Sequence, residues 1–123
     1  MKDYLKVPKE YLNMTTISYE DWKKLDLRIA KIMDVQEHPK ADRLYIIKID
    51  LGTEQRTLVA GLREHYTKEE LLGKKVVVFV NLAPVELRGI KSEGMILAAV
   101  DKIKNKVCII GPEKETDQGA VIQ

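Results

Sequence analysis

Apolar and polar residues alternate along much of the chain with the two-residue period of β-strands. The clearest example is 43–51, where every odd-numbered position from Tyr45 to Leu51 is apolar. Such alternation predicts a strand with one buried face. Apolar runs and alternations of the same kind predict further strands at 27–35, 56–61, 75–80, 95–100 and 106–110.

The first of these strands carries one slip in its pattern. Leu27 and Ile29 fall on one face, whereas Ile32 falls on the other. A two-residue period that slips once indicates a β-bulge or a sharp coil, here near Ala30–Lys31. We therefore expect the first strand to bend and to pair with neighbours on both of its edges.

Two short helices are predicted from the signals at their N-termini. Ser18 is a good N-cap for a helix that ends by Leu25. Ile17 before this cap and Trp22 after it have the spacing of a hydrophobic staple. The run Thr-Lys-Glu-Glu at 67–70 is a capping box, which predicts a second helix between the third and fourth strands.

Three strands, a short helix and two more strands follow one another in the order of the OB-fold, a small Greek-key barrel. We therefore predict an all-β, five-stranded OB barrel with an N-terminal helix and an extra β-rich C-terminal extension. The barrel and these additions are expected to occupy residues 17–123. Residues 1–16 are expected to form an N-terminal arm or a linker.

Composition limits the possible partners of such a barrel. One third of the 123 residues are charged, yet the net charge is only +2, so a polyanion must be met by a local patch. Cys108 is the single cysteine, which excludes an intramolecular disulfide and is consistent with a reducing, cytosolic setting. No apolar run is long enough to span a bilayer. We expect a cytoplasmic domain with no membrane partner.

Few residues offer catalytic or metal-binding chemistry. His38 and His65 are isolated, and we expect each to be a surface or turn-satisfying side chain rather than a zinc ligand. Cys108 lies in an apolar strand and is expected to be a small core residue. There is no glycine-rich phosphate loop and no serine nucleophile elbow. We therefore predict no enzymatic activity, no cofactor and no metal.

The connection 81–95 is long for a link between two strands, and long ordered loops are often functional. Pro84 and two glycines restrict its backbone, and its apolar residues can pin it to a core. The side chains expected to point outward, and to suit phosphate, ribose and base edges, are Asn81, Arg88, Lys91 and Ser92. The alternative is an ordinary Ω-loop held by its own side chains.

The usual ligand face of an OB-fold is made by strands two and three, with the loop after strand one and the loop between strands four and five. Besides the long loop, these positions supply Lys31, Lys40, Arg43, Lys48 and Arg56. Any one of these residues is more often just a solvated side chain. Their convergence on one predicted face favours RNA as the ligand.

Several short runs occur in the order found in one known family. They are 24–32 (KLDLRIAKI), 38–44 (HPKADRL), 58–62 (LVAGL), 70–76 (ELLGKKV), 81–84 (NLAP) and 89–95 (GIKSEGM). Through these runs the chain resembles the tRNA-binding OB domains of the structure-specific tRNA-binding proteins. It is similar in the same way to the C-terminal domain, or separate β subunit, of methionyl-tRNA synthetase.

The resemblance implies non-catalytic binding of tRNA by shape, in the service of methionyl-tRNA synthetase. It also implies a homodimer formed through the N-terminal helix and the C-terminal strands. The family's functional loop corresponds here to Asn81, Arg88, Ser92 and Met95, with Lys31 and Arg43 on the neighbouring face. Met95 is expected to be either an apolar platform for a base or ribose, or an anchor of the loop in the core.

One departure from the family pattern concerns charge. Relatives commonly place basic residues around the loop proline, whereas this chain has Ala83, Val85 and Glu86. The loop consequently has no net charge, and repulsion between Glu86 and phosphate is expected to weaken binding. The alternative function is that of a protein-binding OB dimer related to an export chaperone.

Overall fold

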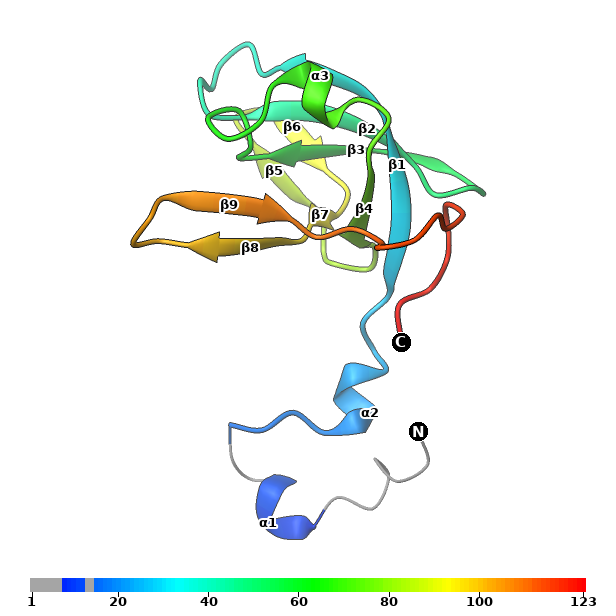
Figure 1. The fold of residues 1–123 in the computed structure, drawn as a ribbon. Coiled ribbons are helices and arrows are strands. Elements are labelled where there is room, and N and C mark those ends of the chain that lie inside the picture. Colours follow the sequence, from blue (N-terminus) through cyan, green and yellow to red (C-terminus); the bar gives the residue numbers. More distant parts are fainter. Residues whose placement is uncertain (1–7, 13–14) are drawn as a thin grey trace.

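The computed structural model describes residues 8–12 and 15–123. Five antiparallel strands form a nearly closed barrel in the order β3-β2-β1-β4-β7 (Figure 1). The strands are β1 Leu27–Glu37, β2 Tyr45–Asp50, β3 Gln55–Ala60, β4 Lys75–Phe79 and β7 Met95–Ile96. The predicted all-β, OB-like fold is therefore confirmed. The prediction for 1–16 falls largely on residues outside the described part of the chain.

Two further hairpins and three short helices lie in the described part of the chain. The hairpins are β5 Val85–Leu87 with β6 Ile90–Ser92, and β8 Ala98–Asp101 with β9 Lys106–Ile109. The helices are α1 Lys9–Leu12, α2 Tyr19–Trp22 and α3 Lys68–Leu71. In Figure 1 the β8–β9 hairpin projects away from the barrel. No helix in the described part of the chain is long and apolar enough to cross a membrane.

The bend predicted in the first strand is present. The first half of β1 pairs with β4 and its second half pairs with β2, and the register shifts between Ile32 and Asp34. The irregularity thus lies about two residues after the predicted site at Ala30–Lys31. The slip in the apolar pattern has a simple cause, because Leu27 and Ile29 face a different cluster from Ile32.

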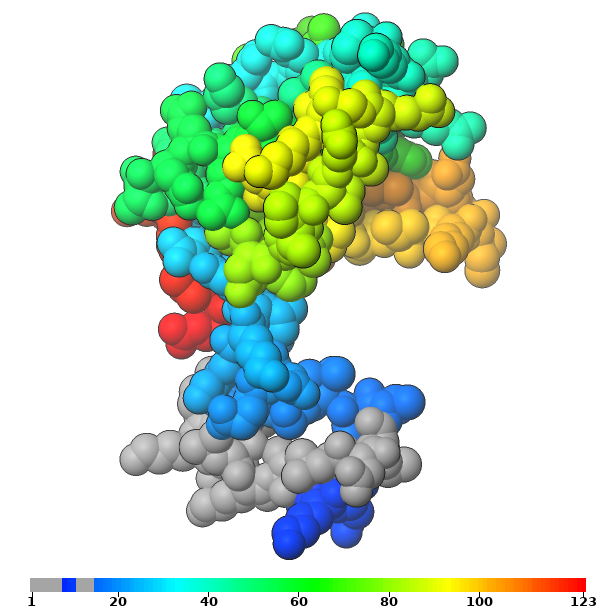
Figure 2. Space-filling view, turned by 180° about the vertical axis from the view of Figure 1, so that it is seen from behind, coloured from blue at the N-terminus to red at the C-terminus, as the bar shows by residue number. Residues whose placement is uncertain are grey.

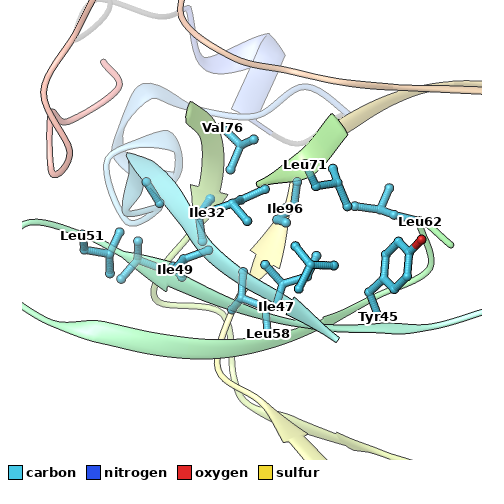
Figure 3. Close-up of a cluster of buried hydrophobic side chains, with 14 residues drawn as sticks. Ile32, Tyr45, Ile47, Ile49, Leu51, Leu58, Leu62, Leu71, Val76 and Ile96 are labelled. Atoms are coloured by element: carbon cyan, nitrogen blue, oxygen red, sulfur yellow. The ribbon is translucent and has the colours of Figure 1, made fainter. Parts of the chain in front are cut away.

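The main core fills the inside of the barrel (Figure 3). Its largest fully buried side chains are Ile32, Ile47, Ile49, Leu51, Leu58, Leu71, Val76 and Val78. They come from β1, β2, β3, β4, the residue after β2 and helix α3. The alternating pattern of 43–51 therefore marked the buried face correctly.

A second cluster covers the outside of the barrel. Leu27, Ile29 and Val77 are buried there, and Trp22 packs against them. The C-terminal segment closes this layer, because Gly119 N–H donates to the carbonyl of Ile29 at 2.7 Å and Ile122 N–H to that of Leu27 at 2.8 Å. Strand β4 is consequently buried on both faces, which explains its unbroken run of valines.

The two predicted helices have the predicted caps. The Ser18 hydroxyl accepts from the backbone of Asp21 at 3.1 Å, and α3 begins with a complete capping box between Thr67 and Glu70. The predicted staple is wrong, because Ile17 is 72% exposed. Trp22 packs instead on the outer cluster.

The C-terminal strands differ from the prediction in two respects. The expected strand 95–100 is split into β7 and β8, with Leu97 between them donating its N–H to Val77 O at 3.0 Å. The prediction that Cys108 lies in the core is also wrong, because Cys108 is exposed. Val107 and Ile109 take the inward positions of β9, so the two-residue period turns Cys108 outward.

Candidate nucleic-acid interface

The connection 81–95 contains a β-hairpin rather than an irregular loop. Glu86 lies opposite Lys91 in its ladder, and Leu87 lies opposite Ile90. Arg88 and Gly89 form the two-residue turn with φ angles of 52° and 88°. Positive φ at both turn positions is typical of a type I′ turn, whose twist matches that of the strands. The hairpin therefore presents Arg88 at its tip on a defined backbone.

Figure 2 shows this hairpin, in yellow-green to yellow, covering one face of the barrel beside the turn between β1 and β2. Besides Arg43, which is described below, three exposed cations belong to the hairpin and that turn: Arg88, Lys91 and Lys40. In the described part of the chain, none of the three takes part in an ion pair. Their charges are consequently available to an anionic ligand.

Ser92 does not point outward, and this part of the prediction is wrong. Its side chain is buried, accepts from Val59 N–H at 2.9 Å and donates to Gly94 O at 3.0 Å. Strand β3 ends the hydrogen-bonded sheet, so its Val59 N–H needs a partner of another kind, which Ser92 supplies. Ser92 thus fastens the hairpin to the barrel.

Asn81 is exposed at the base of the hairpin, but its polar atoms are already engaged. The amide oxygen accepts from Asp26 N–H at 2.7 Å, and the amide nitrogen donates to Lys24 O at 2.7 Å. Asn81 therefore ties the hairpin base to the segment between α2 and β1. An RNA contact by this amide has to compete with both bonds.

Arg56, predicted to lie on the ligand face, is also a structural residue. Its guanidinium donates to the carbonyls of Val80 at 2.6 Å and Glu93 at 3.2 Å, and pairs with Glu54 at 3.0 Å. These bonds connect β3 with both ends of the hairpin connection. Arg56 thus closes the barrel where main-chain pairing is incomplete.

His38 is the residue that joins the two loops of the face. It is only 3% exposed, so of the two expected roles, a surface or a turn-satisfying side chain, it has the second. Nδ1 accepts from Lys40 N–H at 3.0 Å, and Nε2 lies 3.0 Å from Leu87 O. Lys40 and the hairpin tip are thereby brought to the two sides of one imidazole ring. In the sequence, the only sign of this role is that His38 stands in a predicted turn, two residues before Lys40, whose N–H it accepts.

The other predicted site residues lie in different surroundings. Arg43 is exposed and pairs with Glu64 at 2.8 Å. Met95 is 47% exposed on β7, so it is not a core anchor. Lys31 lines a recess of about 620 Å³ beside the C-terminal segment, together with Lys75 and Lys114, and no residue of the β5–β6 hairpin lines that recess. The structure therefore does not place Lys31 on the hairpin face.

The described residues offer little other chemistry. No group of three or more His, Cys, Asp or Glu among them could hold a metal ion. The basic recess around Lys31 is already partly neutralised, because Lys75 donates to the Glu115 carboxylate and to Thr116 O. That hydrogen bond and the positive charge of Lys75 lower the pKa of the Glu115 carboxyl. The hairpin face is thus the better candidate for an anion.

Comparison with known proteins gives a consistent result. The family described as "Putative tRNA binding domain" matches residues 27–121. The methionine–tRNA ligase of Pyrococcus horikoshii is 50% identical over 115 residues, which cover 94% of this chain. The chain spans only 16% of the length of that ligase.

Solved structures with the same fold include proteins with different names. The MetRS related protein from Pyrococcus horikoshii has a TM-score of 0.83 at 28% identity, covering 89% of this chain and 100% of its own. The chaperone CsaA from Bacillus anthracis has a TM-score of 0.79 at 29% identity, with the same coverage.

Proposed function

The chain belongs to this family of tRNA-binding domains, and on that premise we propose that it binds tRNA, without catalysis, on the face formed by the β5–β6 hairpin and the β1–β2 turn. One observation carries the proposal. Arg88 sits at the tip of a type I′ turn with no ion-pair partner among the described residues, and Lys40 and Lys91 belong to the same face. Such an arrangement suits phosphate groups.

The chemistry of the face favours recognition of shape over sequence. Arg88, Lys40 and Lys91 can contact phosphates, whereas Asn81 and Ser92 spend their polar atoms on the protein backbone. Few side chains remain to read base edges. Met95, half-exposed at the base of the hairpin, supplies an apolar surface for a base or ribose.

We also propose that this tRNA binding serves methionyl-tRNA synthetase, in cis or in trans. The support is the 50% identity to a segment of the Pyrococcus horikoshii methionine–tRNA ligase. A module that binds tRNA by shape raises the local concentration of substrate near a synthetase without contacting the reacting atoms.

A homodimer is the proposed assembly. The support is the set of large apolar side chains exposed near the N-terminal helix and the C-terminal strands: Ile17, Val100, Ile103, Ile110 and Val121. Ile103 is 96% exposed at the end of the β8–β9 hairpin. In the proposed dimer these side chains are buried by the second copy of the chain. A monomer in sedimentation at micromolar concentration would contradict the dimer.

Titration of unfractionated tRNA across a salt series tests the main proposal. We expect the affinity to fall steeply with salt, and Arg88→Ala to lower it about tenfold and to reduce the salt slope by about one. The melting temperature should stay unchanged, because Arg88 is exposed. The matched control is Lys102→Ala, which removes one exposed charge from the other hairpin.

Two results would reject this proposal. Absence of wild-type binding even at low salt would exclude tRNA as the ligand. A fall in the melting temperature of Arg88→Ala by several degrees, with unchanged affinity, would assign Arg88 a structural role instead.

A second candidate function is protein binding of a chaperone type. It is favoured by the likeness to the chaperone CsaA and by the absence of net charge in the connection 81–95. The two candidates differ in one measurable respect. Suppression of aggregation of an unfolded polypeptide that is unaffected by Arg88→Ala, without tRNA binding, would favour the second.

A further inference from the structure

The imidazole of His38 occupies a buried position between the two loops of the proposed tRNA-binding face. Lys40 N–H and Leu87 C=O each lie 3.0 Å from one ring nitrogen. One ring nitrogen of His38 thus bonds to the β1–β2 turn and the other to the β5–β6 hairpin.

These two partners define the protonation state of the ring. A backbone N–H can only donate, so Nδ1 must accept and carries no proton. A carbonyl can only accept, so Nε2 must carry the proton and donate to Leu87 O. His38 is therefore a neutral imidazole that acts as acceptor toward its own turn and as donor toward the hairpin.

The bond to Leu87 holds the distal end of the hairpin. Leu87 immediately precedes Arg88, whose φ of 52° is sparsely populated by residues other than glycine. Hairpin strands of three residues are marginal on their own and need packing or tethers. Ser92 fastens the hairpin near its base, so His38 is the tether close to the tip.

We propose that His38 is a positioning residue for tRNA binding: through Leu87 O it fixes the backbone from which Arg88 reaches a phosphate. This inference rests on the proposed function. It adds that affinity depends on a buried side chain with no contact to the RNA. A loosely held tip costs affinity because the cation must be ordered when the ligand binds.

Two substitutions separate the two hydrogen bonds of His38. His38→Asn retains an acceptor close to the position of Nδ1, so it can satisfy Lys40 N–H, but it is too short to reach Leu87 O. His38→Gln is longer and can donate its amide N–H toward Leu87 O, at the expense of the bond within the turn. The pair thus distinguishes a tether of the hairpin from a simple turn-stabilising residue.

The experiment measures tRNA affinity, melting temperature and amide hydrogen exchange across β5–β6 for both variants. We expect His38→Asn to bind tRNA about tenfold more weakly, which is the loss expected if the Arg88 contact is mostly forfeited. Its hairpin amides should exchange faster. His38→Gln should bind within about threefold of wild type, even if it melts lower.

Equal affinity of both variants and wild type would overturn the inference. So would an affinity that follows the melting temperature, with His38→Gln the weaker binder. Failure of the proposed function is recognised separately, because wild-type protein would then not bind tRNA. In that case faster hairpin exchange in His38→Asn than in His38→Gln still supports the tether, and equal exchange rejects it.

Discussion

Two hairpins leave the barrel, and they differ in how they are held and in what they present. The β5–β6 hairpin is fastened by side chains near both of its ends, Ser92 and His38, and carries Arg88 at its tip. The β8–β9 hairpin is held at its base, where Ile109 N–H donates to Tyr66 Oη at 3.0 Å. Its far end carries Ile103, which is almost fully exposed.

How firmly each hairpin is held matches the kind of partner that its exposed end suits. A charged tip needs a rigid support, because a phosphate contact gains little if the cation must be ordered on binding. An apolar projection can be ordered by the partner that buries it. In the functions proposed above, the first hairpin therefore suits an anion and the second suits a protein surface.

The strongest test of the first hairpin is Ser92→Ala. Removal of the hydroxyl leaves the buried Val59 N–H without an acceptor, which we expect to lower the free energy of unfolding by about 1–3 kcal/mol. Chemical denaturation measures this loss. Lys91→Ala, at the neighbouring exposed position, should change stability by less than about 0.5 kcal/mol. Equal stability of both variants would mean that Ser92 is no fastener.

The second hairpin is tested by Val100→Asp combined with Ile103→Asp. If these side chains are buried in the proposed dimer, the charges should weaken association about 100-fold, because burying an unpaired carboxylate is costly. Sedimentation measures the effect, and hydrogen exchange of β5–β6 should not change. Arg88→Ala should leave the oligomeric state intact. A double variant that remains dimeric would remove β8–β9 from the interface.

A smaller effect is expected from Glu86→Lys on the face of the first hairpin. The change removes a repulsive charge and should raise tRNA affinity about threefold, with a salt slope steeper by about one. The new lysine lies opposite Lys91 in the ladder, and repulsion between the two charges should lower the free energy of unfolding by a few tenths of a kcal/mol at most, or about 0.3. Glu113→Lys, beside the C-terminal segment, is the control with the same change in charge. Equal gains in both variants would indicate a bulk charge effect.

The smallest effect concerns the segment that follows the second hairpin. Lys75 holds the pKa of Glu115 below its ordinary value of 4.5, so the folded state binds this proton less readily than the unfolded chain. The ion pair of Glu115 with Lys75 therefore contributes to the stability of the folded state above pH 4.5, and this contribution is lost as the pH falls through the lowered pKa. Amide exchange of 115–119 should rise in that window, whereas Glu115→Gln should show no such dependence.

Prediction from the sequence succeeded where one local pattern decides the outcome. The odd-numbered apolar residues of β2 and the capping box before α3 act over a few positions, and both are found as expected. Prediction failed where partners lie far apart in the chain. Ser92 binds Val59, Asn81 binds Asp26 and His38 binds Leu87, and no local pattern records such pairs.

The sequence also failed to predict which residues are buried where two apolar layers meet. Cys108 lies in an apolar run, yet the neighbours that enter the core are Val107 and Ile109. Leu27 and Ile29 are buried outside the barrel and Ile32 inside it, so one strand serves two clusters. The pattern revealed the slip, but only the packing of the C-terminal segment showed what covers the outer face.

The sequence by itself determined the order of strands and helices along the chain, the caps of the helices and the loop that carries Arg88, because each depends on neighbouring residues. Only the tertiary structure decided which polar residues of that loop remain available. Ser92, Asn81 and Arg56 became structural because strand edges and loop ends leave backbone groups unpaired. The same rule placed His38 between two loops, where its two ring nitrogens satisfy one group from each.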